Sequence, residues 1–201
     1  MSDTDNTQII AKITEILTSP EAMRIDFIFG TIKVDSAGLY TVVAALASGV
    51  VTVEIGEVSA LAAAEYYSTG NHFKFPSETY GATDDEKQAI LHESVHAMQD
   101  LAFGQVYPSR GTFYTYETEN EAAAYVAGAL YYKFATGKAD DQSGEASFDE
   151  AARIAKILED KPGGVASDED VNRMRLFVAN DPTYWFNTSL YEPTFANGPS
   201  E

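Results

Sequence analysis

Apolar residues recur at helical spacing in several parts of the chain. Over residues 8–18 they return every three or four positions, which predicts an amphipathic helix that ends before Pro20. The apolar run at 40–46 predicts a second helix with Gly49 as its stop signal. Further helices are predicted, each from its own apolar pattern, over residues 84–103, 119–136, 147–160 and 168–179.

Other segments have the composition of short strands. Residues 50–55 are β-branched and bounded by glycines, and 63–67 and 71–75 are separated by the turn residues Ser-Thr-Gly. Pro76 directly follows the last of these segments, which predicts that 71–75 is an edge strand.

The order of these elements predicts an α+β fold. A small N-terminal sheet with its helices (residues 1–83) is followed by two long helices (84–136) and a mainly helical C-terminal part (137–201). The length of 201 residues fits a single domain with one core. The tail after Asn180 is irregular and aromatic, and we expect it to pack back on the body of the protein.

The helix predicted at 84–103 contains the pattern HExxH, since residues 92–96 read His-Glu-Ser-Val-His. Two histidines four residues apart project from the same helix face one turn apart, so both imidazoles can reach one metal ion. Glu93 lies on the neighbouring face, where it can contact a metal-bound water without being a ligand. This arrangement is typical of zinc hydrolases.

The surroundings of this motif favour a partly buried helix. Thr83 and Glu86 form a capping box before the helix, and apolar residues flank the histidines. The alternative is a helix that binds no metal and carries His and Glu as ordinary polar residues. Because the chain has only three histidines, a chance pairing at this spacing is improbable.

The composition removes several classes of function. A net charge of −18 repels phosphate groups, which disfavours nucleic acid and anionic membranes as partners. The absence of cysteine excludes disulfides and thiolate zinc ligands. No signal peptide and no membrane span are recognisable, so a soluble cytoplasmic protein is expected.

A catalytic zinc site needs a third protein ligand, and several familiar spacings are missing. An HExxHxxGxxH extension would require Gly and His where the chain has Gln99 and Ala102. Asp100 lies one turn beyond His96, too far along the helix to join the pair. His72 is interpreted as a surface residue of its strand. Three glutamates at the start of the next predicted helix remain: Glu117, Glu119 and Glu121.

At this point the chain resembles the gluzincin-type zinc metallopeptidases and small bacterial zincin-like proteins, over residues 63–132. In the gluzincins a glutamate on the helix after HExxH is the third ligand, often in a Glu-x-x-Ala context, and both Glu119 and Glu121 have Ala at +3. We favour Glu121, which lies deeper in the helix and has small neighbours that permit close helix approach. Glu119 remains the alternative, and Glu117 fits better as a first-turn acid.

The resemblance implies a zincin-like fold, one Zn²⁺ per chain and a peptide or protein substrate. Glu93 would act as general base towards a zinc-activated water. An extended peptide would add to the edge strand, predicted above as 71–75. A tyrosine could stabilise the oxyanion, and the candidates are Tyr107, Tyr114, Tyr116 and Tyr125.

Two other hypotheses remain open. In the first, the fold is zincin-like but not catalytic, and zinc only joins two helices in an interaction module. In the second, the chain is an acidic interaction protein without metal. The sequence does not indicate an oligomeric state.

Overall fold

The computed structural model describes residues 6–59, 62–106, 114–139, 145–181 and 193–195. It confirms an α+β architecture of helices and small sheets, with a mainly helical C-terminal half. The described α-helices are α1 (Thr7–Leu17), α2 (Ser36–Ser48), α3 (Asp84–Val106), α4 (Glu117–Thr136), α5 (Ala146–Leu158) and α6 (Asp168–Asn180).

The helices form where the sequence predicts them, with differences at their ends. The capping box of α3 is present: the Glu86 N–H donates to Thr83 Oγ1 (3.2 Å), and the Thr83 N–H donates to Glu86 Oε2 (3.0 Å). Helix α3 continues to Val106, beyond the predicted end at residue 103. Helix α2 begins earlier than expected because Asp35 caps it, accepting a hydrogen bond from the Gly38 N–H at 2.8 Å.

The strands form two three-stranded sheets and one two-stranded sheet rather than a single small sheet. The first sheet has the order β2-β1-β7 and contains a hairpin that the sequence pattern did not reveal. Its strands are β1 (Asp26–Phe29), β2 (Ile32–Asp35) and β7 (Gly164–Val165). Among the described residues after Asn180, β8 (Pro193–Phe195) pairs with β6 (Tyr114–Tyr116), whereas Trp185 lies outside the described residues.

The second sheet has the order β3-β5-β4, which corrects the prediction of an edge strand at 71–75. Strand β5 (His72–Phe75) is central; it pairs in parallel with β3 (Thr52–Ile55) and antiparallel with β4 (Glu65–Tyr67). Pro76 does not prevent this because it follows the last residue of the strand and no ladder hydrogen bond requires its N–H. The edge beside α3 is therefore β4.

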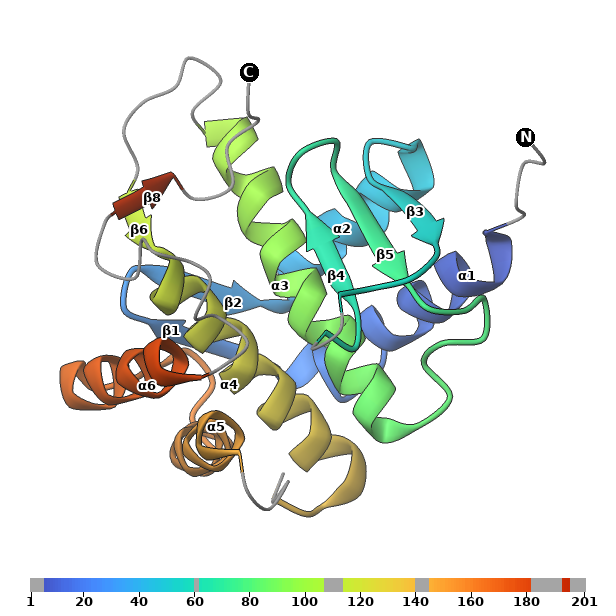
Figure 1. The fold of residues 1–201 in the computed structure, drawn as a ribbon. Coiled ribbons are helices and arrows are strands. Elements are labelled where there is room, and N and C mark those ends of the chain that lie inside the picture. Colours follow the sequence, from blue (N-terminus) through green and yellow to red (C-terminus); the bar gives the residue numbers. More distant parts are fainter. Residues whose placement is uncertain (1–5, 60–61, 107–113, 140–144, 182–192, 196–201) are drawn as a thin grey trace.

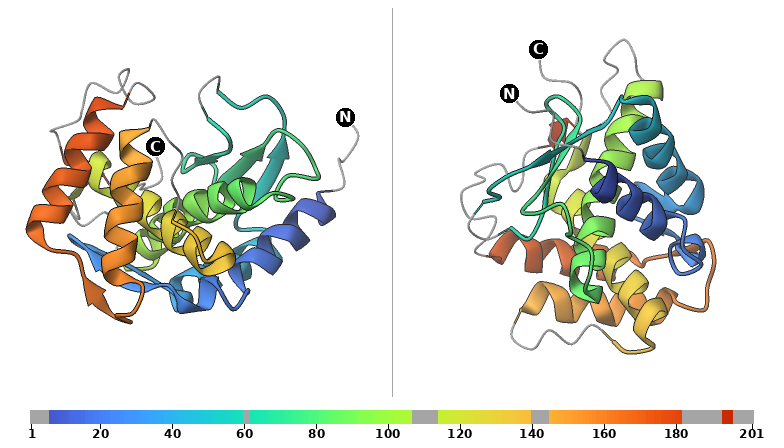
Figure 2. Two further views of the ribbon diagram at one scale, coloured as in Figure 1. Left: turned by 90° about the horizontal axis from the view of Figure 1, so that it is seen from below. Right: turned by 90° about the vertical axis from the view of Figure 1, so that its right-hand side faces the viewer.

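Helix α3 lies in the middle of the molecule. The β3-β5-β4 sheet covers one of its sides and α2 packs on the opposite side, with α1 next to α2 (Figures 1 and 2). Helix α4 runs alongside α3, and α5 and α6 pack on α4 (Figure 1). This arrangement surrounds the centre of α3 with protein on several sides.

Helices α3 and α4 approach closely at a glycine. A Cβ atom added to Gly128 would lie 3.1 Å from Gln88 Cγ, which is tighter than ordinary contact. Most of α4 is buried around this point, including the run from Ala122 to Leu130. The small residues that favoured Glu121 as a ligand thus do bring the two helices together.

Candidate metal site

The two histidines of the HExxH pattern project from one face of α3, as the spacing predicts. The Nε2 atoms of His92 and His96 are 3.2 Å apart, and both side chains are largely buried. Their rings are inclined at 71°, so the two nitrogens converge on one point instead of lying stacked.

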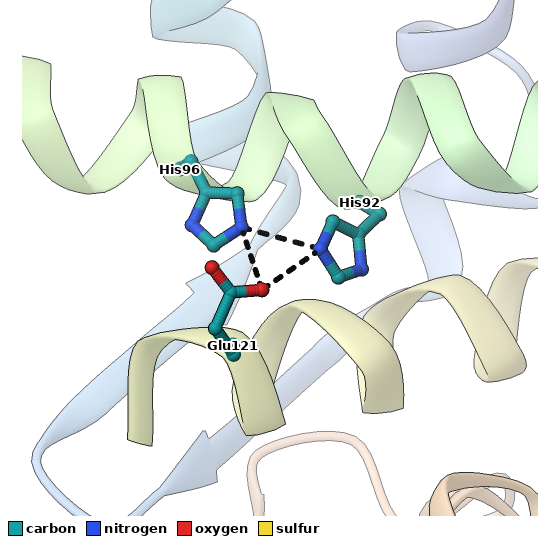
Figure 3. A group of neighbouring side chains, drawn as sticks. All are labelled: His92, His96 and Glu121. Atoms are coloured by element: carbon teal, nitrogen blue, oxygen red, sulfur yellow. Dashed lines mark hydrogen bonds and ion pairs between the residues drawn. The ribbon is translucent and has the colours of Figure 1, made fainter. Parts of the chain in front are cut away.

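Glu121 enters the same point from α4. Its Oε2 lies 3.3 Å from His92 Nε2 and 3.4 Å from His96 Nε2, and the three side chains meet between the two helices (Figure 3). Within the described part of the chain, these three form the one group of His, Asp or Glu residues arranged to hold a metal ion. Of Glu119 and Glu121, the latter is therefore the one that faces the histidines.

The donor atoms are spaced as a metal ion requires. Ligands 2.0–2.1 Å from a tetrahedral centre lie about 3.3 to 3.4 Å from one another. The observed separations of 3.2, 3.3 and 3.4 Å are close to this value on all three sides of the triangle. Two imidazole nitrogens and one carboxylate oxygen form a donor set that suits a divalent transition metal.

Glu119 has a different role. It is 5% exposed, and its Oε1 accepts hydrogen bonds from the Thr31 N–H and the Thr31 hydroxyl, both at 2.8 Å. Gly30 and Thr31 form the turn between β1 and β2. Gly30 has a φ of 57°, and a side chain at this position would collide with Glu119. Glu119 therefore anchors the β1–β2 hairpin on α4. The side chain of Glu117 lies outside the described residues.

The electrostatics of Glu121 match a carboxylate that faces cations. Burial acts to raise its pKa, but the charge of His96 and hydrogen bonds from His92 and His96 outweigh burial and hold the pKa well below its ordinary value. The carboxylate is thus ionised and available as a ligand atom.

Glu93 lies next to this group without joining it. Its Oε2 accepts a hydrogen bond from the main-chain N–H of Tyr66 in strand β4 at 2.8 Å. Burial raises the pKa of Glu93; the charges of His92 and His96 oppose this effect only in part. The structure therefore places a second, more basic carboxylate beside the ligand triangle.

Aromatic residues support the ligands from the side of α4. The ring of Tyr125, one turn after Glu121, contacts the His92 ring edge-on, with centroids 4.8 Å apart, and Phe148 of α5 packs on Tyr125 in turn. Tyr107 and the side chains of Tyr114 and Tyr116 lie outside the described residues, so among the oxyanion candidates only Tyr125 is seen beside the site.

His72 and Asp100 are not part of the metal-binding group, as the sequence predicted. The His72 ring stacks on Tyr67 at 4.9 Å and lies 3.9 Å from Glu54. Asp100 instead accepts a hydrogen bond from the Tyr66 hydroxyl at 2.8 Å. The contacts of Tyr66 were not predicted, because no pattern in a short strand signals a hydrogen bond to Glu93, 27 residues later in the chain.

In comparisons with known proteins, no family model matches the chain, and no curated protein or solved structure is significantly similar to it. None of the helices in the described residues combines the length and apolar character needed to cross a membrane.

Proposed function

We propose that this protein is a zinc-dependent hydrolase that cleaves peptide bonds. The observation that carries the proposal is the position of Glu93. Its partly buried carboxylate lies next to the group formed by His92, His96 and Glu121 but is not one of the three candidate ligands. A site that only bound metal would not need this fourth group.

His92, His96 and Glu121 would hold the ion. Two histidines and one glutamate form a donor set found in catalytic zinc sites, and three protein ligands leave one position open. When bound in such a site, zinc supplies a Lewis acid that polarises a carbonyl group and makes water more acidic. The resemblance of the chain to gluzincins, which rests on the HExxH pattern and the following glutamate helix, agrees with this choice of metal.

Glu93 would move the proton. As a general base it accepts a proton from the attacking water and then passes it to the leaving amine. The hydrogen bond from the Tyr66 N–H fixes one of its oxygens, which restricts rotation of the carboxylate. Fixed orientation of the base is a large part of such catalysis.

Strand β5 is central in its sheet, so an extended peptide would not add to the 71–75 strand. The substrate would lie beside α3 near β4, whose Tyr66 N–H already donates to Glu93 and is not free to pair with a peptide. The side chain of Tyr125, packed on His92, is the described candidate to stabilise an oxyanion.

The test compares the wild type with Glu93→Gln on a mixed peptide library, with zinc content measured on the same samples. We expect about one zinc per chain in both proteins and cleavage only by the wild type. Glu86→Gln is the matched control, because it makes the same change on the same helix and a glutamine still serves the capping box. Cleavage by Glu93→Gln at the wild-type rate would refute the role of Glu93.

A structural metal is the second candidate function. The ligands come from two helices that pack closely on each other, so a bound ion would join α3 to α4. In that case zinc would stabilise the fold, and the wild type would cleave no peptide in the library.

A further inference from the structure

Tyr66 is hydrogen-bonded to α3 at both of its ends. Its main-chain N–H donates to Glu93 Oε2, and its phenol hydroxyl donates to Asp100 Oδ2, each at 2.8 Å. The ring between these two groups packs on Phe73 of the central strand, with centroids 5.1 Å apart. One residue of the edge strand thus spans a stretch of the helix.

The helix presents the two acids to Tyr66 on one side. Glu93 and Asp100 are seven residues apart, which is close to two full helical turns, so their side chains leave α3 in nearly the same direction. His96 lies between them in the sequence. The contacts of Tyr66 therefore bracket the stretch of α3 that carries the second histidine.

Asp100 is buried and is held by neutral donors. It is 6% exposed, and its Oδ2 receives the Tyr66 hydroxyl. The side-chain amide of Asn71, oriented so that its nitrogen donates, lies 2.8 Å from the same oxygen. Asn71 ends the turn between β4 and β5 in a left-handed conformation, with φ of 48°. Asp100 thereby binds both the edge strand and the turn that leads out of it.

These contacts have a mechanical consequence for Glu93. Strand β4 is three residues long and pairs with β5 on one side only. A short edge strand has few contacts to keep it in place. The hydrogen bonds of Tyr66 to α3 therefore hold the side of β4 that does not pair with β5. The position of the Tyr66 N–H, which orients Glu93, therefore depends on the hydrogen bond that holds the Tyr66 side chain on Asp100.

We propose that Asp100 is a positioning residue for the hydrolytic site: it acts through Tyr66 to keep the β4 main chain on the carboxylate of Glu93. The inference rests on the proposed function of Glu93, but the hydrogen-bonded link from Asp100 to Glu93 can be measured without any activity. Asp100 touches neither substrate nor metal in this role.

The first measurement is hydrogen exchange of the Tyr66 amide by NMR, on zinc-loaded full-length protein. Tyr66→Phe and Asp100→Ala each remove the side-chain bond and leave the main chain intact. We expect the amide of residue 66 to exchange about fivefold faster or more in both, the effect of losing one hydrogen bond. Asp100→Asn should restore protection, because the amide oxygen can accept from both Tyr66 and Asn71.

Tyr67→Phe is the matched control. Its hydroxyl donates to Glu65 at 3.0 Å on the exposed part of the same strand, so its loss leaves the contacts with α3 in place. Wild-type exchange at residue 66 in both Tyr66→Phe and Asp100→Ala would overturn the inference. Equal acceleration in Tyr67→Phe would also overturn it, because a general loosening of the strand would then explain the result.

The second measurement is peptide hydrolysis by the same variants. We expect kcat to fall about tenfold in Tyr66→Phe and Asp100→Ala, with KM and zinc content unchanged, and to recover in Asp100→Asn. An unchanged kcat in an active enzyme would overturn the positioning role. If the wild type cleaves nothing while the exchange data behave as expected, the proposed function fails and the link between Asp100 and Glu93 stands.

Discussion

Glu119 and Glu121 are two residues apart on α4, yet their carboxylates bind different parts of the fold. Glu121 Oε2 lies 3.3 Å from His92 Nε2, whereas Glu119 Oε1 accepts from Thr31 at 2.8 Å. Successive helical residues are rotated by about 100°, so positions i and i+2 point to nearly opposite faces. One glutamate therefore faces the histidines of α3, and the other faces the β1–β2 hairpin.

This division predicts opposite results for two alanine substitutions. Glu121→Ala should weaken zinc binding by more than about a hundredfold, since even residues that only support a ligand contribute ten- to hundredfold. Glu119→Ala should retain the metal but lower the free energy of unfolding by about 1 to 3 kcal/mol, because both hydrogen bonds from Thr31 to the buried Glu119 carboxylate are lost. Zinc titration and urea denaturation of both variants test this. Metal loss in Glu119→Ala alone would reverse the assignment.

Removal of the metal should loosen the contact between α3 and α4. A ligand that binds only the folded state at a hundred times its Kd stabilises that state by about 2.7 kcal/mol. For a chain of this size we therefore expect a chelator to lower Tm by about 5 to 10 °C, and zinc to restore it. Thermal scans with chelator and with added zinc measure the effect. His72→Ala should respond like the wild type, and a Tm insensitive to chelator would argue against a bound ion.

The Glu119 anchor also predicts a difference between two glycines. Gly30 and Gly49 both have positive φ, 57° and 74°, but a Cβ at Gly30 would collide with Glu119 Oε1, whereas nothing lies within 4 Å of a Cβ at Gly49. Gly49→Ala should cost about 1 kcal/mol, the strain of alanine in a left-handed conformation. Gly30→Ala should cost at least about 2 kcal/mol more, because Glu119 must also move from Thr31. Equal losses in denaturant unfolding would show that the anchor contributes little.

The sequence predicts those parts of the site that depend on local geometry. The convergence of His92 and His96 follows from a spacing of four residues, and the start of α3 follows from Thr83 and Glu86. The sequence favours Glu121 over Glu119 as the third ligand but does not exclude Glu119. Helical geometry separates their faces, but which face meets α3 depends on the packing of other elements.

The unpredicted elements are those whose stability depends on tertiary contacts. Strands β1 and β2 have four residues each, too few for a clear alternation, and the buried anchor at Glu119 holds their turn. The central place of β5 depends on pairing with β3, about 20 residues earlier in the chain. Tyr66 meets Glu93 and Asp100 only because the sheet lies on α3. No spacing within the chain encodes these contacts.

Asp100 predicts a pH dependence of stability with a definite sign. Burial raises its pKa from 3.8 to about 6, and the hydrogen bond from Tyr66 opposes this shift only in part. The folded state therefore binds a proton more tightly than the unfolded chain, and ionisation of Asp100 destabilises the fold as pH rises from about 4 to about 6. This difference in pKa corresponds to a loss of no more than about 3 kcal/mol in the free energy of unfolding.

Asp100→Asn removes this titration and retains an acceptor for Tyr66. We expect the stability of the variant relative to the wild type to increase by up to about 3 kcal/mol between pH 4 and pH 7, whatever the constant offset between the two proteins. Urea unfolding of both proteins across this range measures the difference. Both samples are treated with chelator, so that neither contains bound metal. A constant difference across the range, or a variant that becomes relatively less stable at pH 7, would show that the Asp100 carboxylate is not held in a buried, weakly solvated environment.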